Sequence, residues 1–227
     1  MIGERKAGAF VASEIGRSGG ERRDWKERRH ATKPVALDLR ATGERRLVPD
    51  RRLGDDGVDL RSRVMIDERT GLFSRGFFEA ALKRELARCR RHGAMASLVL
   101  IDVDDFKATN DRWGEGAGDA ALRATAAVVG RHLRATDVAC RYGGDEFAII
   151  LPDTYRSGAL FVAERILAEV RRSFERGVDG CRVALTVSVG VAWYGAMCST
   201  LGEFLEAADR ALDAAKAAGG DRVEEAL

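Results

Sequence analysis

Two short acidic segments contain the residues whose types and spacing could do chemistry. The first is Arg141–Phe147, RYGGDEF, where Asp145 and Glu146 follow Gly143 and Gly144. Neighbouring carboxylates repel each other, which predicts a positive group beside them. Glycines inside a strand pattern mark a turn or a close backbone approach, so a phosphate or a base could reach this turn with no Cβ in the way.

The second segment ends a buried strand, where Asp102 and Asp104 share one face because side chains alternate along a strand. Such a pair can be no more than a turn or a helix cap. If the RYGGDEF turn lies beside it, however, three or four carboxylates meet and need cations to stay ionised. Hard oxygen ligands favour Mg²⁺ or Mn²⁺. Two such ions, completed by substrate phosphates, would form a site for phosphoryl or nucleotidyl transfer.

Hydrophobic periodicity predicts the elements that position these acids. Helices are expected over 75–93, 118–135, 156–174 and 201–220, with a short helix and a turn within 58–75. Strands are expected over 95–103, 137–144, 146–152 and 182–194. The order predicts an α+β fold with a ferredoxin-like β-α-β-β-α-β core, a mixed sheet flanked by helices. The hairpin turn and the end of the first strand would then lie side by side.

Composition bounds the class of protein. The 227 residues are 45% hydrophobic and 33% charged, and the net charge is only +2, which gives no global attraction to nucleic acid. No apolar run approaches the roughly 20 residues of a membrane span, and the N-terminus lacks a signal-peptide core. We therefore expect a cytoplasmic protein without a membrane span or a nucleic-acid partner. The four scattered cysteines predict buried, reduced thiols.

Residues 1–58 differ from the remainder, 59–227, which we expect to be one domain. They are rich in arginine and repeat the pattern E-R-R-x-x-x-acid-R-R at Glu21–Arg29 and Glu44–Arg52. One interpretation is a disordered arm whose charges are locally balanced. The other is an arginine clamp for a phosphate-bearing ligand or for the acidic face of a protein partner.

Several motifs, in order, resemble the GGDEF family of bacterial diguanylate cyclases. These are DERTGLFSR, similar to the family's D-x-L-T-G-L-x-N-R, then IDVDDFKATNDRWGEGAGD, RYGGDEF, TVSVGVA and AADRALDAAKAAG. The resemblance covers about residues 62–223. It implies a palm-like nucleotide-cyclase fold and condensation of two GTP into cyclic di-GMP, with release of pyrophosphate. It also implies a homodimer, in which each copy holds one GTP and the active site forms between facing copies.

The resemblance also assigns roles to individual residues. Asp102, the Val103 carbonyl and Asp145 would bind two Mg²⁺ (or Mn²⁺), with Asp145 as a possible general base and Glu146 as a further acid. Lys107, Lys216 and the backbone of Phe106 would contact the triphosphate, beside Gly143 and Gly144. Asn110 and Asp119 would read guanine, whose N1–H and N2–H₂ donors suit a carboxylate. Without the resemblance, Lys107 and Lys216 would be interpreted as solvated helix lysines. Asn110 and Asp119 would be interpreted as turn and cap residues.

A second match is RATD, Arg134–Asp137, at the family's spacing from Gly143 for an allosteric product site. Arg134, Asp137 and Arg165 would bind cyclic di-GMP as an inhibitor, through a guanidinium fork and an acid. Without the resemblance, they would be a helix-end arginine and a turn aspartate.

The chain also departs from the family pattern. Glu115, a substrate-site position, replaces a common His; Gly220-Asp221 replaces Arg-Asn; and Asp213 replaces a common Tyr. An active cyclase remains the leading interpretation, because the predicted metal acids, Lys107 and the guanine readers are all present. The alternative is a weak or inactive receptor or scaffold that binds cyclic di-GMP.

Overall fold

The computed structural model describes residues 65–175, 185–195 and 198–226. The predicted N-terminal arm lies outside these residues. A six-stranded sheet has the order β1-β3-β4-β2-β5-β6. Its strands are β1 (Phe73–Ser74), β2 (Ala96–Val103), β3 (Val138–Arg141), β4 (Glu146–Pro152), β5 (Val187–Tyr194) and β6 (Val223–Glu225). The helices are α1 (Arg75–His92), α2 (Phe106–Trp113), α3 (Glu115–Arg131), α4 (Arg156–Glu175) and α5 (Leu201–Ala217).

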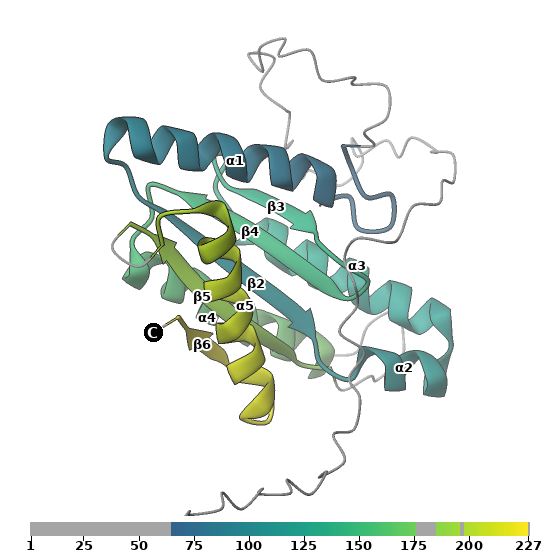
Figure 1. The fold of residues 1–227 in the computed structure, drawn as a ribbon. Coiled ribbons are helices and arrows are strands. Elements are labelled where there is room, and N and C mark those ends of the chain that lie inside the picture. The colour runs from purple at the N-terminus through teal and green to yellow at the C-terminus, as the bar shows by residue number, and fades with distance from the viewer. Residues whose placement is uncertain (1–64, 176–184, 196–197, 227) are drawn as a thin grey trace, which may run out of the picture. The chain divides into compact units, whose positions relative to one another are not determined.

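Helices pack on both faces of the sheet, as Figure 1 shows for α5 in front and α4 behind. On one face, α1 and α5 bury side chains such as Phe78 and Phe204 against Leu98 and Ile150 of the central strands. On the other face, α3 and α4 contribute to a separate cluster around Phe147. The strands thus bury both faces, which is why their sequences read as nearly continuous apolar runs.

The predicted core is confirmed. The hairpin β3–β4 is antiparallel, and β2 pairs antiparallel with both β4 and β5. The predicted helix over 75–93 ends one residue earlier, because Gly93 has φ +64°, the left-handed conformation of a helix C-terminus. The other three predicted helices also differ at their ends. Helix α3 runs over Glu115–Arg131 rather than 118–135, α4 ends at Glu175 rather than 174, and α5 ends at Ala217 rather than 220.

One prediction at the start of the domain is wrong over the residues that the structure describes, while the first part of the predicted segment, 58–64, lies outside them. Where a short helix was expected, residues 65–72 form no helix, but a turn and a single bridge between Ile66 and Phe73. Within this turn Asp67, whose carboxylate accepts hydrogen bonds from Thr70, holds the chain in a closed geometry that competes with helix formation.

Three elements were not predicted: the edge strands β1 and β6 and the helix α2. Strand β1 has only two residues and β6 three, too few for a periodic signal. Helix α2 buries only Thr109, so its eight residues lack an apolar stripe. The chain enters α2 through Asp105, a non-glycine residue with φ +51°.

Candidate active site and product pocket

Strand pairing brings the two acidic segments together. Asp102, near the end of β2, is the direct partner of Glu146, the first residue of β4. The Val103 N–H donates to the carbonyl of Asp145 at 3.1 Å, which fixes the hairpin turn against the strand end. The predicted juxtaposition is therefore confirmed.

The positive group beside these acids is Lys216, in the last turn of α5. Its Nζ lies 2.8 Å from Oδ2 of Asp102. Burial raises the pKa of Asp102 to about 6, against the lowering effect of Lys216 and with a further raising effect of Asp145 and Glu146. Burial alone would lower the pKa of Lys216, but the three acids outweigh it and the pKa is raised.

Asp104 takes a structural position instead of joining this group. Its carboxylate accepts hydrogen bonds from the hydroxyls of Thr186 and Ser188, both at 2.6 Å, and from the N–H of Asp221 at 3.1 Å. Among the residues described, no three or more His, Cys, Asp or Glu side chains are grouped to hold a metal ion. Asp102, Asp145 and Glu146 still lie close together at this strand end, whereas the hydroxyls of Thr186 and Ser188 and the 219–222 turn use the carboxylate of Asp104.

The remaining oxygen donors still suit a hard cation. Two carboxylates, Asp102 and Asp145, and the carbonyl of Val103 lie at adjoining backbone positions, because Val103 is hydrogen-bonded to Asp145. This set is incomplete by itself, as expected for Mg²⁺ sites completed by phosphate oxygens and water. A Cβ on Gly143 would lie 2.1 Å from Oε2 of Glu146, so the glycine allows the acid to fold back over the turn.

Helices α2 and α3 hold the predicted substrate positions on the other side of the β2 end. Lys107 and Glu115 are exposed, and Phe106 packs partly into the core. The Oδ1 of Asn110 is buried and has no hydrogen-bond partner among the described residues, and a Cβ on Gly118 would lie 1.9 Å from it. Because Gly118 has no side chain, Asn110 of α2 packs against α3 one residue before Asp119.

Two arginines near these positions were not singled out from the sequence. Arg69 forms an ion pair with Asp119 at 2.9 Å. Arg141 donates from Nη2 to the Gly144 carbonyl at 2.6 Å and pairs with Asp67 at 3.4 Å. The adjacent acids of the hairpin could have suggested Arg141, whereas only the fold brings Arg69 to Asp119.

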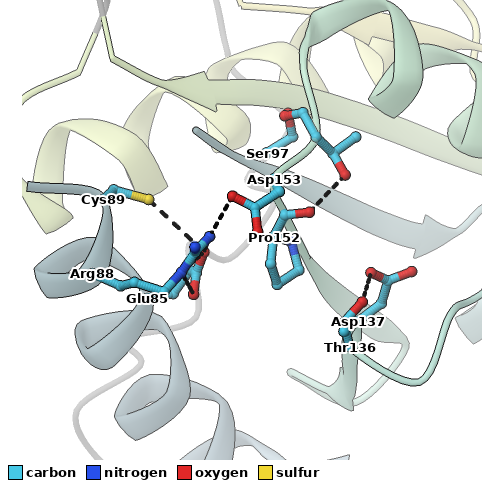
Figure 2. A network of polar contacts seen from close by, with 9 residues as sticks. Glu85, Arg88, Cys89, Ser97, Thr136, Asp137, Pro152 and Asp153 are labelled. Atoms are coloured by element: carbon cyan, nitrogen blue, oxygen red, sulfur yellow. Dashed lines mark hydrogen bonds and ion pairs between the residues drawn. The ribbon is translucent and has the colours of Figure 1, made fainter. Parts of the chain in front are cut away.

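A cavity of about 300 Å³ collects the predicted product-site residues Arg134, Asp137 and Arg165. Asp137 is buried and accepts from the Arg134 N–H at 2.8 Å, and Figure 2 shows its contact with the Thr136 hydroxyl. Burial raises the pKa of Asp137. The exposed ring of Phe161, another lining residue missed from the sequence, lies 5.5 Å from the Arg165 guanidinium.

The α4 side of this cavity follows a well-anchored turn after β4. Ser97 Oγ donates to the Thr154 carbonyl at 2.8 Å. Figure 2 shows Arg88 of α1 directed at Asp153 and at Glu85, with both ion pairs at 2.7–2.8 Å.

Three of the cysteines, Cys89, Cys140 and Cys198, are free and buried as predicted; Cys181 lies outside the described residues. Within the described ranges, no helix combines the length and apolar character needed to cross a membrane.

Comparisons with known proteins agree with this geometry. Residues 64–222 match the family model described as diguanylate cyclase, GGDEF domain. Diguanylate cyclase DosC of Escherichia coli K12 is 37% identical over 164 residues, which are 72% of this chain and 35% of that protein. Probable diguanylate cyclase DgcC of the same strain is 39% identical over 70% of this chain and 42% of its own length. This chain thus spans well under half the length of these relatives.

Among solved structures, the GGDEF domain of DgcB from Caulobacter crescentus, in complex with cyclic di-GMP, is 35% identical. Its TM-score is 0.67, and the match covers 74% of this chain and 98% of that one. SiaD from Pseudomonas aeruginosa, in complex with its activator SiaC, gives 0.65 at 35% identity, over 74% and 64% of the two chains. With the same fold and the same ordered motifs, this chain belongs to the GGDEF-domain family of diguanylate cyclases.

Proposed function

We propose that this protein is a diguanylate cyclase that condenses two GTP into cyclic di-GMP and two pyrophosphates. The observation that carries the proposal is the pairing of Asp102 with Glu146 across β2 and β4, with Asp145 at the adjoining turn and Lys216 on Asp102. This places acids and a lysine at one strand end, where nucleotide triphosphate chemistry needs both.

Asp102, Asp145 and the Val103 carbonyl would hold Mg²⁺ or Mn²⁺, two ions per site. When bound, the ions neutralise triphosphate charge and stabilise the charge that develops at the reacting phosphate. The buried position of Asp102 and its raised pKa support this role, because a cation would lower the cost of its ionised form.

The protein side chains would divide the remaining work. In each of two steps, the 3′-oxygen of one GTP forms a bond to the α-phosphorus of the other, and the bond from that phosphorus to pyrophosphate breaks. Asp145 would accept the proton of the 3′-hydroxyl. Lys107, the Phe106 backbone and Lys216 would contact the triphosphate, with Glu146 as the further acid. The Gly143–Gly144 turn leaves room for the phosphates.

Guanine would be read by Asn110 and Asp119. The Oδ1 of Asn110 has no hydrogen-bond partner among the described residues and lies against Gly118, so rotation of the amide would turn it toward the base without breaking a hydrogen bond at that oxygen. The Asp119 carboxylate suits the N1–H and N2–H₂ pair of guanine, which adenine lacks. Glu115, exposed at the start of α3, would lie at the rim of this site.

Because each copy would hold one GTP, activity requires a homodimer with facing sites.

The pocket at Arg134, Asp137 and Arg165 would bind cyclic di-GMP as product and inhibitor, and Phe161 offers an exposed face for a base to stack on. The structure of SiaD with its activator supports protein partners as a means of control in this family. A partner for residues 1–58 and a cytoplasmic location stay predictions.

The test is incubation of the purified full chain with GTP and Mg²⁺, with nucleotides resolved by chromatography. The wild type should form cyclic di-GMP and pyrophosphate, and Asp145→Asn or chelation of the metal should stop this. Asp153→Asn is the matched control, because it removes an exposed aspartate at the opposite end of β4. A wild type that forms no product but binds added cyclic di-GMP would be a receptor instead.

A further inference from the structure

The predicted guanine reader Asp119 already has a cationic partner. Arg69 Nη1 lies 2.9 Å from Asp119 Oδ1, although the residues are 50 positions apart in the chain. The side chain of Arg69 is 61% exposed and that of Asp119 is 32% exposed. The contact is therefore an accessible ion pair at the edge of the predicted substrate site.

Arg69 is presented by a defined turn. Oδ1 of Asp67 accepts hydrogen bonds from the Thr70 N–H at 2.9 Å and from its hydroxyl at 2.7 Å. The Gly71 N–H donates to the Asp67 carbonyl at 2.8 Å, and Gly71 has the left-handed φ of +71°. Arg141 then pairs with Asp67 at 3.4 Å. These bonds fix the backbone that carries Arg69, so its contact with α3 belongs to the fold.

The residue type also departs from the motif that this segment resembles. In the pattern D-x-L-T-G-L, which residues 67–72 otherwise match, the third residue is a leucine, and here it is Arg69. A leucine could not compete for a carboxylate. An arginine at the same position brings five N–H donors and a fixed charge to Asp119.

We infer that Arg69 competes with the guanine base for the carboxylate of Asp119 and thereby weakens GTP binding, an inference that rests on the proposed function. A base that donates N1–H and N2–H₂ uses both carboxylate oxygens. It therefore competes with Arg69 for the lone pairs of Oδ1 and for the space beside that oxygen. Because exposed ion pairs contribute little free energy, the nucleotide can displace Arg69. The expected penalty is about two- to fivefold in affinity.

The test is calorimetric titration of the full chain with GDP and Mg²⁺, and with ADP as the base control. Arg69→Gln should bind GDP about two- to fivefold more tightly than the wild type, and the gain should shrink as salt screens the wild-type ion pair. Arg172→Gln is the matched control. Arg172 is also 61% exposed and pairs with Glu169 at 2.8 Å, on a helix that supplies no predicted substrate residue. The Arg172→Gln variant loses the same positive charge as Arg69→Gln and should leave the affinity for GDP unchanged.

A second background tests the mechanism. In Asp119→Asn, which cannot form the ion pair, the additional Arg69→Gln change should no longer improve GDP binding. Equal or weaker GDP binding by Arg69→Gln overturns the inference but leaves the proposed function intact, provided that the wild type prefers GDP to ADP. If neither the wild type nor Arg69→Gln prefers GDP, the proposed function fails and the inference fails with it.

Discussion

Lys216 and Asp102 form an ion pair of 2.8 Å that joins the last turn of α5 to the end of β2. Asp102 is only 9% exposed, so its carboxylate depends on this ammonium for compensation. The pair connects two of the elements that a triphosphate would contact, and it does so on the sheet face covered by α5.

We predict that Lys216→Met lowers the free energy of unfolding by about 1 kcal/mol, a value kept small because the lysine is partly exposed. The reason is that the buried Asp102 loses its cationic partner. Urea denaturation measures the effect, and Lys83→Met, an exposed lysine of α1, is the control. In an Asp102→Asn background, the cost should vanish. An undiminished cost there would mean that Lys216 acts through its alkyl packing.

Gly190 should be essential for packing α5 on β5. A Cβ at this position would lie 2.4 Å from both the Ala208 carbonyl and the Leu212 nitrogen, which are backbone atoms. Gly190→Ala should therefore cost about 1–3 kcal/mol of folding free energy, because the helix must move away. Thermal denaturation would measure this, beside Gly202→Ala, whose Cβ would meet no atom of the described residues within 4 Å. Equal melting temperatures for both variants would contradict the close approach.

Gly143→Ala should affect activity more than stability. Its Cβ would meet the Glu146 carboxylate at 2.1 Å, and this side chain, unlike backbone, can rotate away. We expect a cyclization rate at least about tenfold lower, equivalent to roughly 1.4 kcal/mol of transition-state free energy, with a melting temperature near that of the wild type. Steady-state kinetics and a melting curve on the same sample test both parts. A strongly destabilised variant would show that the backbone of the turn, and not the Glu146 side chain, moves to make room for the Cβ.

Arg134→Ala should relieve inhibition by cyclic di-GMP. Arg134 lines the cavity that also contains Asp137 and Arg165, and loss of one charge-assisted contact should raise the inhibitory concentration about tenfold. The initial rate without added product should be unchanged. Arg172→Ala, which does not line the cavity, is the control. Inhibition that remains unchanged would assign the product site elsewhere.

His132 should make stability depend on pH. Burial lowers the pKa of His132, with Arg165, Arg131 and Arg172 acting in the same direction and Glu169 opposing. Both ring nitrogens are buried, and neither has a hydrogen-bond partner in the part of the chain that the structure describes. A folded-state pKa below the unfolded value means that the unfolded chain binds more protons. Stability from this group is therefore present at high pH and is lost as the pH falls through about 6.5, the unfolded pKa.

His132→Leu removes that titration. Its melting temperature should fall less than that of the wild type between pH 7.5 and pH 5.5, because the remaining acids titrate equally in both proteins. Parallel falls in the two proteins would mean that His132 is solvated in the folded state.

The sequence by itself determined the central sheet, the helices with strong apolar stripes and the motifs of the family. It did so because hydrophobic periodicity and motif spacing are local properties of the chain. Even the pairing of Asp102 with the hairpin acids followed, since a β-α-β-β-α-β order leaves the hairpin strand next to the first strand.

Only the tertiary structure decided how individual charges are used. Asp104 is identical in type to Asp102 and two residues away, yet Ser188 and Thr186 take its carboxylate. Arg69 reads as a surface arginine until the 67–71 turn meets α3 at Asp119. Helix α2 and strand β6 likewise form through contacts with α3 and β5. Such partners lie far apart in sequence, and no local pattern encodes which of several equivalent charges will meet.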